Sequence, residues 1–207
     1  MSPILTPHFM QKVLIATHNV GKFKELMEVL KKLPFEFLSL DDLDIEEDVD
    51  EVGKTFEDNA ILKAEFFGKM VNLPTIADDS GIHVDALADE LGVKTRRWGA
   101  GAEASDQEWL DFFLNRMADE SNRRAEFVTT IALYQPKKKI KTFQGECVGQ
   151  ILNAPQVELE EGIPLSAVFL PEGKDKVYSA MDKSEKNEIS HRGKAISQCL
   201  EYLEASL

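Results

Sequence analysis

The spacing of apolar residues predicts a chain in which strands and helices alternate. Short continuous apolar runs indicate buried strands, and apolar positions three and four residues apart indicate helices that bury one face. On this basis strands are expected at residues 13–16, 35–40, 75–77, 124–134, 140–152 and 166–170. Helices are expected at residues 23–32, 56–71 and 106–117, and from a cap at Ser184 to about Leu203. This order of elements predicts a mixed α/β fold.

Two adjacent carboxylates follow the short strand predicted at residues 75–77. Pro74 ends the preceding helical pattern, so that Asp78, Asp79, Ser80 and Gly81 are expected where this strand ends. Each carboxylate raises the free energy needed to ionise the other. A divalent cation removes that penalty, and oxygen ligands suit magnesium. An Asp-Ser-Gly turn without any metal explains the same residues, so this stretch alone does not decide between the two.

A second polar segment lies between the predicted strand at residues 13–16 and the helix that follows it. Its sequence is Thr17-His-Asn-Val-Gly-Lys22. Free N–H groups at a helix start attract phosphate, and the Lys22 ammonium adds a positive charge. The segment lacks the two glycines and the Lys-Ser/Thr pair of the Walker motif. An ordinary strand–helix connection with a surface lysine is an equally good interpretation of this segment alone.

Composition limits the class of protein further. The 207 residues, 43% of them hydrophobic, fit one domain spanning residues 1–207. A net charge of −13, from 24 basic and 37 acidic residues, argues against nucleic-acid and membrane partners but allows a small anionic ligand. No apolar run is long enough for a membrane span, and the residues up to Lys12 lack a signal-peptide core. Cys147 and Cys199 lack metal-site spacing and are expected to be buried thiols of a cytoplasmic protein.

Four segments in this order resemble the Ham1/inosine triphosphate pyrophosphatase family. They are Thr17-His-Asn-Val-Gly-Lys22, Thr55-Phe-Glu-Asp-Asn-Ala60, Ala77-Asp-Asp-Ser-Gly81 and Ser190-His-Arg-Gly-Lys-Ala195. The resemblance implies an elongated mixed β-sheet with flanking helices and two lobes around a central nucleotide cleft, in a homodimer. It also implies an Mg²⁺-dependent enzyme that hydrolyses noncanonical purine nucleoside triphosphates, of the ITP and XTP type, to monophosphate and pyrophosphate.

The same resemblance assigns roles to individual residues. The triphosphate-gripping segment matches Thr17, His18, Asn19, Val20, Gly21 and Lys22. Further substrate contacts match Ser80, Lys186, His191 and Arg192. Asp79 matches the catalytic carboxylate and is expected to act as general base, with Lys22 also catalytic and with Asp79, Glu51 and Asp78 as candidate magnesium ligands. At 3.6 residues per turn the last three basic residues do not share one helical face, so either Gly193 marks an irregular junction or they contact different parts of the ligand.

The base-recognition segment departs from the family pattern Gly-Phe-Gly-Tyr-Asp-Pro. Here Gly162-Ile-Pro-Leu-Ser stands in its place, so that Ile163 replaces the stacking Phe and Ser166 replaces the Asp that reads the purine edge. The same chemistry on another modified or pyrimidine nucleotide, a sensor that binds without hydrolysis, and a metal-dependent phosphomonoesterase are therefore alternatives. Trp98 is a candidate replacement ring, although packing is the favoured interpretation, and Trp109 is expected in the core.

Overall fold

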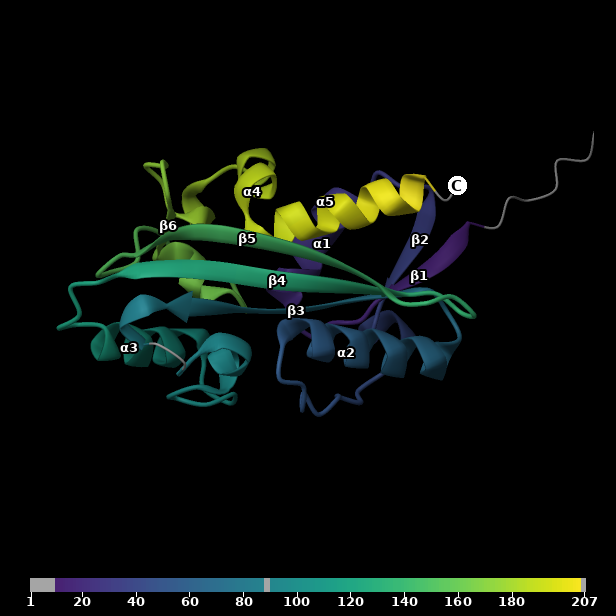
Figure 1. Cartoon of the computed structure of the whole chain (residues 1–207), viewed down its shortest axis with the longest axis horizontal. Coiled ribbons are helices and arrows are strands. Elements are labelled where there is room, and N and C mark those ends of the chain that lie inside the picture. The colour runs from purple at the N-terminus through teal and green to yellow at the C-terminus, as the bar shows by residue number, and fades with distance from the viewer. Residues whose placement is uncertain (1–9, 88–89, 206–207) are drawn as a thin grey trace, which may run out of the picture.

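A six-stranded mixed sheet forms the centre of the molecule in the computed structural model, which describes residues 10–87 and 90–205 (Figure 1). The strands are β1 (Gln11–Ile15), β2 (Phe35–Ser39), β3 (Thr75–Val84), β4 (Arg124–Tyr134), β5 (Lys141–Ile151) and β6 (Phe169–Pro171). Their order across the sheet is β2-β1-β3-β4-β5-β6. Strand β1 runs parallel to β2 and β3, and the remaining pairs are antiparallel. This confirms the expected mixed sheet.

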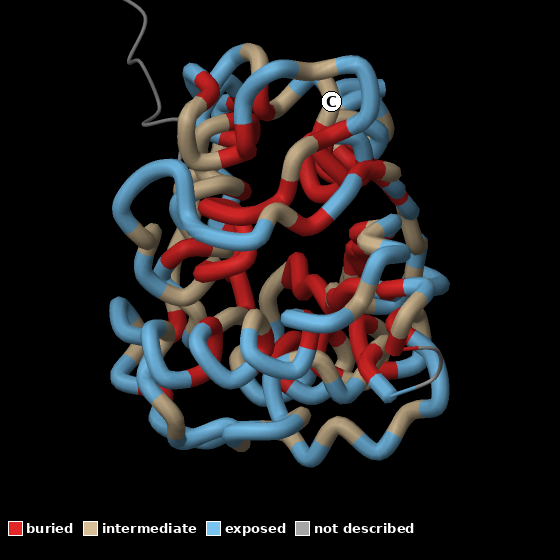
Figure 2. Tube along the Cα trace, turned by 90° about the vertical axis from the view of Figure 1, so that its left-hand side faces the viewer, coloured by how far each residue is buried: buried red, intermediate tan, exposed pale blue. Residues whose placement is uncertain are grey.

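Helices cover both faces of the sheet. They are α1 (Val20–Leu30), α2 (Phe56–Val71), α3 (Asp106–Arg116), α4 (Lys183–Ile189) and α5 (His191–Glu204). In Figure 1, α2 and α3 lie below the sheet, and α1, α4 and α5 lie above it. Buried residues gather along the inner sides of these layers, whereas the connecting loops are exposed (Figure 2). The two-layer covering explains why the central strands read as continuous apolar runs.

Two apolar clusters meet β3 from opposite sides. The stripe of α2, which includes Ala64 and Phe67, packs with Ala77 below the sheet. Leu26 of α1 and Ile196 of α5 belong to the cluster that contains Ile76 above it. Because side chains alternate along a strand, these contacts determine on which face of the sheet each later side chain of β3 lies.

Three predicted element boundaries are wrong. Strand β3 does not stop at residue 77, because β4 pairs with it along its whole length and places Asp78 opposite Ile131. The predicted strand at residues 166–170 is a 3-10 turn, Pro164–Ala167, followed by β6. The single last helix is two helices, capped by Asp182 and Ser190 instead of Ser184. The break explains why the basic residues 186, 191 and 192 share no helical face.

The described helices show no membrane-spanning candidate, since none in residues 10–87 and 90–205 is long and apolar enough. The expectation about a signal-peptide core falls mainly on residues 1–9, which lie outside the described residues. The other helices and the hairpin between β4 and β5 lie within a few residues of their predicted positions.

Candidate functional site

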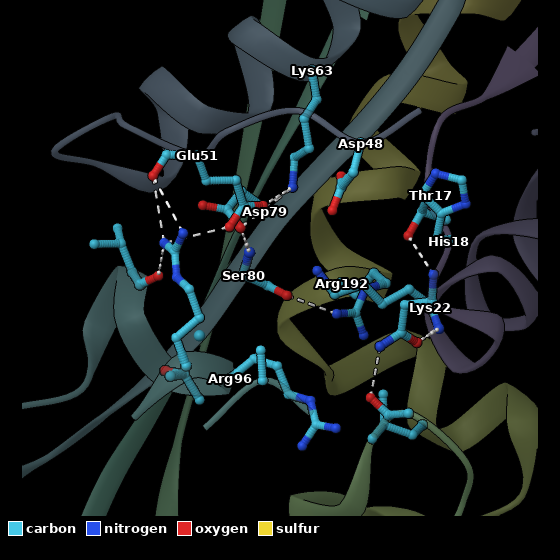
Figure 3. Close-up of a pocket in the computed structure, with 18 of the residues that line it drawn as sticks. Thr17, His18, Lys22, Asp48, Glu51, Lys63, Asp79, Ser80, Arg96 and Arg192 are labelled. Atoms are coloured by element: carbon cyan, nitrogen blue, oxygen red, sulfur yellow. Dashed lines mark hydrogen bonds and ion pairs between the residues drawn. The ribbon is translucent and has the colours of Figure 1, made fainter. Parts of the chain in front are cut away.

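A cleft of about 440 Å³ opens beside the middle of β3. Its wall contains most of the residues that the family resemblance indicates, namely Thr17, His18, Asn19, Lys22, Glu51, Asp79, Ser80, His191 and Arg192. Figure 3 shows that they reach the cleft from the start of α1, the loop before α2, β3 and the start of α5. The fold therefore brings together segments that are separated by up to about 170 residues in the sequence.

The turn before α1 is held by its own side chains. Asn19 caps the helix, because its Oδ1 accepts a hydrogen bond from the Lys22 backbone N–H at 2.9 Å. Asn19 Nδ2 also donates to the Gly162 carbonyl at 2.8 Å. Gly21 packs so closely against residues 161–163 that an added Cβ would lie 2.5 Å from a backbone oxygen. Val20 and Gly21 are not among the described residues that line the cleft, and the close packing of Gly21 shapes the turn.

Asp78 lies on the upper face of β3, among cations. Its carboxylate is fully buried, 3.2 Å from Lys22 Nζ and 3.4 Å from Arg192 Nε. Arg192 also donates to Ser80 Oγ at 2.9 Å. Burial acts to raise the pKa of Asp78, but these two cations outweigh it and hold the pKa well below its ordinary value. Burial lowers the pKa of Lys22, and Asp78 only partly offsets that effect.

Glu25 of α1 links Arg192 to a further buried cation, Lys186. It pairs with Lys186 at 2.7 Å and with Arg192. Burial acts to raise the pKa of Glu25, yet Arg192 and Lys186 hold it below its ordinary value. Sequence reasoning missed this residue, and the available signal was its position one turn after Lys22 on the same helix.

Asp79 lies on the lower face of β3, opposite to Asp78. Its Oδ2 accepts a hydrogen bond from Asn59 Nδ2 at 3.0 Å, and its Oδ1 lies 3.5 Å from Lys63 Nζ. Lys63 also contacts Glu51 at 2.6 Å, so a single ammonium joins the two carboxylates (Figure 3). Burial raises the pKa of Asp79 despite the nearby Lys63. Three carboxylates do not converge here, because Asp78 points to the other side of the sheet.

Lys63 and Asn59 are site residues that sequence reasoning missed. Both lie on the buried stripe of α2, four residues apart, and they are 9% and 0% exposed. Polar residues within an apolar stripe must find partners, and here both find Asp79. That pattern was visible in the sequence but was read only as helix periodicity. Burial acts to lower the pKa of Lys63, and Asp79 leads the carboxylates that raise it overall.

The opposite end of the cleft is apolar. This apolar end consists of Trp109, Phe127, Ile163, Pro164 and Leu165, beside Ser166 and His191. The His191 ring stacks on Phe127, with ring centroids 4.5 Å apart. Burial holds the pKa of His191 well below its ordinary value, so the imidazole is neutral at pH 7.

The structure confirms the favoured packing role of Trp98 and the expected burial of Trp109, but it also places Trp109 at the cleft. Trp98 packs edge-on against Phe112 and donates its Nε1–H to Glu90, and it is not among the described residues that line the cleft. Trp109, expected only in the core, is 2% exposed and lines the apolar end of the cleft. The apolar helix stripe correctly predicted its burial but could not show that one side of the ring borders a cavity.

Comparison with known proteins agrees with this arrangement. The family model described as the Ham1 family matches residues 13–202. A dITP/XTP pyrophosphatase of Bacillus subtilis (strain 168) is 37% identical over 198 residues, which cover 95% of this chain and 98% of that protein. Solved structures of the Ham1 protein from Staphylococcus aureus and of a HAM1 protein from Coxiella burnetii are 34% and 32% identical and superpose with a TM-score of 0.79 in each case. Each covers 95% of this chain and 100% of the solved chain. The chain therefore belongs to the Ham1 family.

Proposed function

We propose that this protein is a nucleoside-triphosphate pyrophosphatase that converts ITP- or XTP-like nucleotides, in ribose or deoxyribose form, to monophosphate and pyrophosphate. Cationic side chains at one end of the cleft suit a triphosphate, and the apolar end suits a base. The relatives named dITP/XTP pyrophosphatase support this substrate class. The observation on which the proposal chiefly rests is the buried Asp79, which lines the same cleft as the cationic and apolar side chains.

The charges around the cleft indicate that the triphosphate brings a cation with it. Among the described residues, the ion pairs of the cleft-lining residues and of their partners join six cations, Lys22, Lys63, Arg96, Arg97, Lys186 and Arg192, to six carboxylates, Glu25, Glu51, Asp78, Asp79, Asp106 and Glu160. The charges within these ion pairs balance before any ligand binds. A triphosphate that entered alone would therefore add uncompensated negative charge to a partly buried site.

Asp79 and Glu51 fit a magnesium ion. Their carboxylates already share one cationic group, the Lys63 ammonium, and Mg²⁺ typically binds through one or two carboxylates together with substrate phosphates. When bound, this ion would neutralise charge on the phosphates that react. Asp78 does not fit the same role, because its fully buried carboxylate already pairs with Lys22 and Arg192. We therefore propose Asp78 as a structural counterion.

The protein's own groups then have distinct tasks. Lys22 and Arg192 bind the triphosphate and hold it in the cleft, where Ser80 offers a further hydrogen bond. Asp79 accepts a proton from the attacking water, since its raised pKa gives it a basicity suited to that step. Asn59 fixes the orientation of the carboxylate through its 3.0 Å hydrogen bond.

The deciding experiment is a magnesium-dependent screen of standard, deaminated and oxidised nucleoside triphosphates, with pyrophosphate and orthophosphate detected separately. Pyrophosphate from ITP or XTP is expected, and Asp79→Asn should lower kcat by about 10²–10⁴-fold. The matched control is Asp111→Asn on α3, which alters a carboxylate that hydrogen-bonds to Gln107 away from the cleft. Orthophosphate would instead indicate a phosphomonoesterase, and product from a pyrimidine nucleotide would indicate a changed base preference. Binding without any product would indicate a sensor.

We further propose, from the family resemblance, that the protein is a cytoplasmic homodimer. Light scattering coupled to size-exclusion chromatography tests the dimer directly, because a 23.3 kDa chain should elute with twice that mass. A monomeric mass at micromolar concentration would refute it.

A further inference from the structure

One guanidinium contacts both the carboxylate and the backbone of Glu51. Arg97, at the end of the 3-10 helix η3 (Gly92–Arg97), places Nη2 3.6 Å from Glu51 Oε2. Both of its terminal nitrogens also donate to the Glu51 carbonyl oxygen at 3.5 Å. The same Nη2 donates to the Val93 carbonyl at 3.4 Å, which ties the guanidinium to its own helix. Arg97 and Glu51 both line the cleft, so this contact bears directly on the candidate metal ligand.

The helix η3 is fixed to β3, the strand that carries Asp79. Thr95 Oγ1 accepts a hydrogen bond from the Ile82 N–H at 3.1 Å and donates to the Gly92 carbonyl at 2.6 Å. Gly81 permits this close approach, because an added Cβ there would lie 2.4 Å from the Gly92 oxygen. Since Gly81 and Ile82 belong to the same strand as Asp79, the end of η3 has a fixed position relative to that carboxylate.

Glu51 itself lies in a connection that contains no helix or strand, residues 44–55. Contacts from outside this loop therefore determine where its carboxylate lies. Two cations hold different oxygens of that carboxylate, because Lys63 contacts Oε1 at 2.6 Å and Arg97 contacts Oε2. If a divalent cation replaced the Lys63 ammonium at Oε1, the Arg97 contact at Oε2 would still hold the carboxylate.

We propose that Arg97 is a positioning residue, which holds the Glu51 carboxylate where it can bind a divalent cation together with Asp79. This inference rests on the proposed function and its metal site. Groups that hydrogen-bond to a metal ligand typically change metal affinity or activity by about 10–100-fold when they are replaced. Because the Arg97 side chain is 45% exposed, its ion pair contributes little to folding stability, and its effect is on the position of Glu51.

Mn²⁺ binding, measured by the loss of the free-ion electron paramagnetic resonance signal, tests this role without catalysis. Arg97→Met should raise the Mn²⁺ dissociation constant about tenfold or more. Loss of a positive charge alone would leave the constant unchanged or lower it, because cations repel each other. Arg97→Lys keeps the charge but cannot bridge two oxygens with one planar group, so it should also weaken binding.

The matched control is Arg96→Met, in the adjacent residue of η3. The Arg96 guanidinium donates to the Ala104 carbonyl at 2.5 Å and does not contact Glu51 among the described residues. Its exposed charge is screened by salt, so the Mn²⁺ dissociation constant should stay within about twofold of wild type. Unchanged or tighter Mn²⁺ binding in Arg97→Met, wild-type binding in Arg97→Lys, or equal weakening in Arg96→Met would overturn the inference.

Glu51→Gln separates this inference from the proposed metal site. It should weaken Mn²⁺ binding if Glu51 is a ligand. If Glu51→Gln bound Mn²⁺ as wild type does, both the proposed site and the role of Arg97 would be refuted. If Glu51→Gln lost binding but Arg97→Met did not, only the role of Arg97 would be refuted.

Amide hydrogen exchange gives a second measurement, on protein freed of divalent cations. The backbone N–H groups of Val52 and Gly53 follow Glu51 in the loop and form hydrogen bonds of 2.9 and 2.8 Å, so their exchange reports movement of this segment. Both should exchange faster in Arg97→Met than in wild type, with Tm nearly unchanged, and at the wild-type rate in Arg96→Met. Equal exchange in all three proteins would overturn the positioning role.

Discussion

Asp78→Asn should strongly destabilise the protein, whereas the same change at the adjacent Asp79 should not. Asp78 is fully buried and lies 3.2 Å from Lys22 Nζ and 3.4 Å from Arg192 Nε. Removing one partner of a buried ion pair costs about 3–5 kcal/mol, because it leaves buried charge uncompensated. Burial already lowers the pKa of Lys22, which can lose its proton in the variant, so we expect the lower end of this range. For a protein of this size, about 3 kcal/mol lowers Tm by roughly 6–12 °C.

Asp79→Asn is the matched control because the two pKa values shift in opposite directions. The pKa of Asp78 is lower in the folded state than in the unfolded chain, so its contribution to stability is present above the unfolded value and is lost as pH falls. The pKa of Asp79 is higher in the folded state than in the unfolded chain. Its contribution to folding stability is therefore fully present when the pH is below the pKa of the unfolded chain, and it is lost as pH rises through the pKa of the folded state. Ionised Asp79 therefore lowers stability at pH 7, and Asp79→Asn should raise Tm while it lowers turnover.

Urea unfolding at pH 7 and at pH 4 measures both effects. At pH 7 the order of stability should be Asp79→Asn, then wild type, then Asp78→Asn. At pH 4 the three proteins should be closer together, since about half of each unfolded carboxylate is protonated near this pH. An Asp78→Asn protein within about 1 kcal/mol of wild type at pH 7, or one more stable than Asp79→Asn, would refute the assignment of counterion and catalytic carboxylate.

Three further changes test single contacts. Gly162→Ala should lower stability by about 2–4 kcal/mol in thermal unfolding and should raise KM. The reason is that φ is +78° and the new Cβ would lie 2.5 Å from a side-chain oxygen of the α1 turn. The control is Gly173→Ala, where φ is +74° but nothing lies within 4 Å, so the loss should be limited to about 1–2 kcal/mol. Lys63→Met should move the acidic limb of the pH–rate profile to higher pH, because the Lys63 ammonium lowers the pKa of Asp79. The control is Lys69→Met, an exposed position on the same helix, and it should leave the profile unchanged. Ser190→Ala removes the 3.0 Å cap of α5 and should lower stability by about 1 kcal/mol in urea unfolding, and an unchanged midpoint would contradict the capping role.

Most of the fold could be predicted because local patterns determine its elements. The apolar stripe and the Thr55 capping box define α2, and both cap hydrogen bonds are present in the structure. Strand β3 was predicted too short because its polar centre, at Asp78 and Asp79, resembles a turn in the sequence. Only pairing with β4, which is more than forty residues later in the chain, keeps these carboxylates inside the sheet. Such long-range pairing has no local signal.

The site residues divide into those that a family motif indicates and those that no such motif indicates. Family motifs indicated Asp79, Lys22 and Arg192, and the structure places all three at one cleft. They did not indicate Glu25 or Lys63, whose positions on α1 and α2 are visible in the sequence but whose ion-pair partners become known only from the fold. The magnesium, the dimer and the individual roles stay predictions until the assays above are made.

Hydrogen bonds of Asn19 connect the triphosphate end of the cleft to the base-recognition segment. They explain how the phosphate site can stay intact although the base-recognition segment is altered. Asn19 caps α1 and bonds to Gly162, so the backbone at the start of the base segment is fixed by the triphosphate end. Ile163 packs against Gly21 of the α1 turn, but Ser166 lies four residues beyond Gly162 and can change without moving that backbone contact. Substitution of Ser166 should therefore alter selectivity among bases more than kcat for the preferred one, whereas substitution of Asn19 should affect every nucleotide. A kcat that collapsed for all nucleotides in a Ser166→Ala protein would contradict this separation.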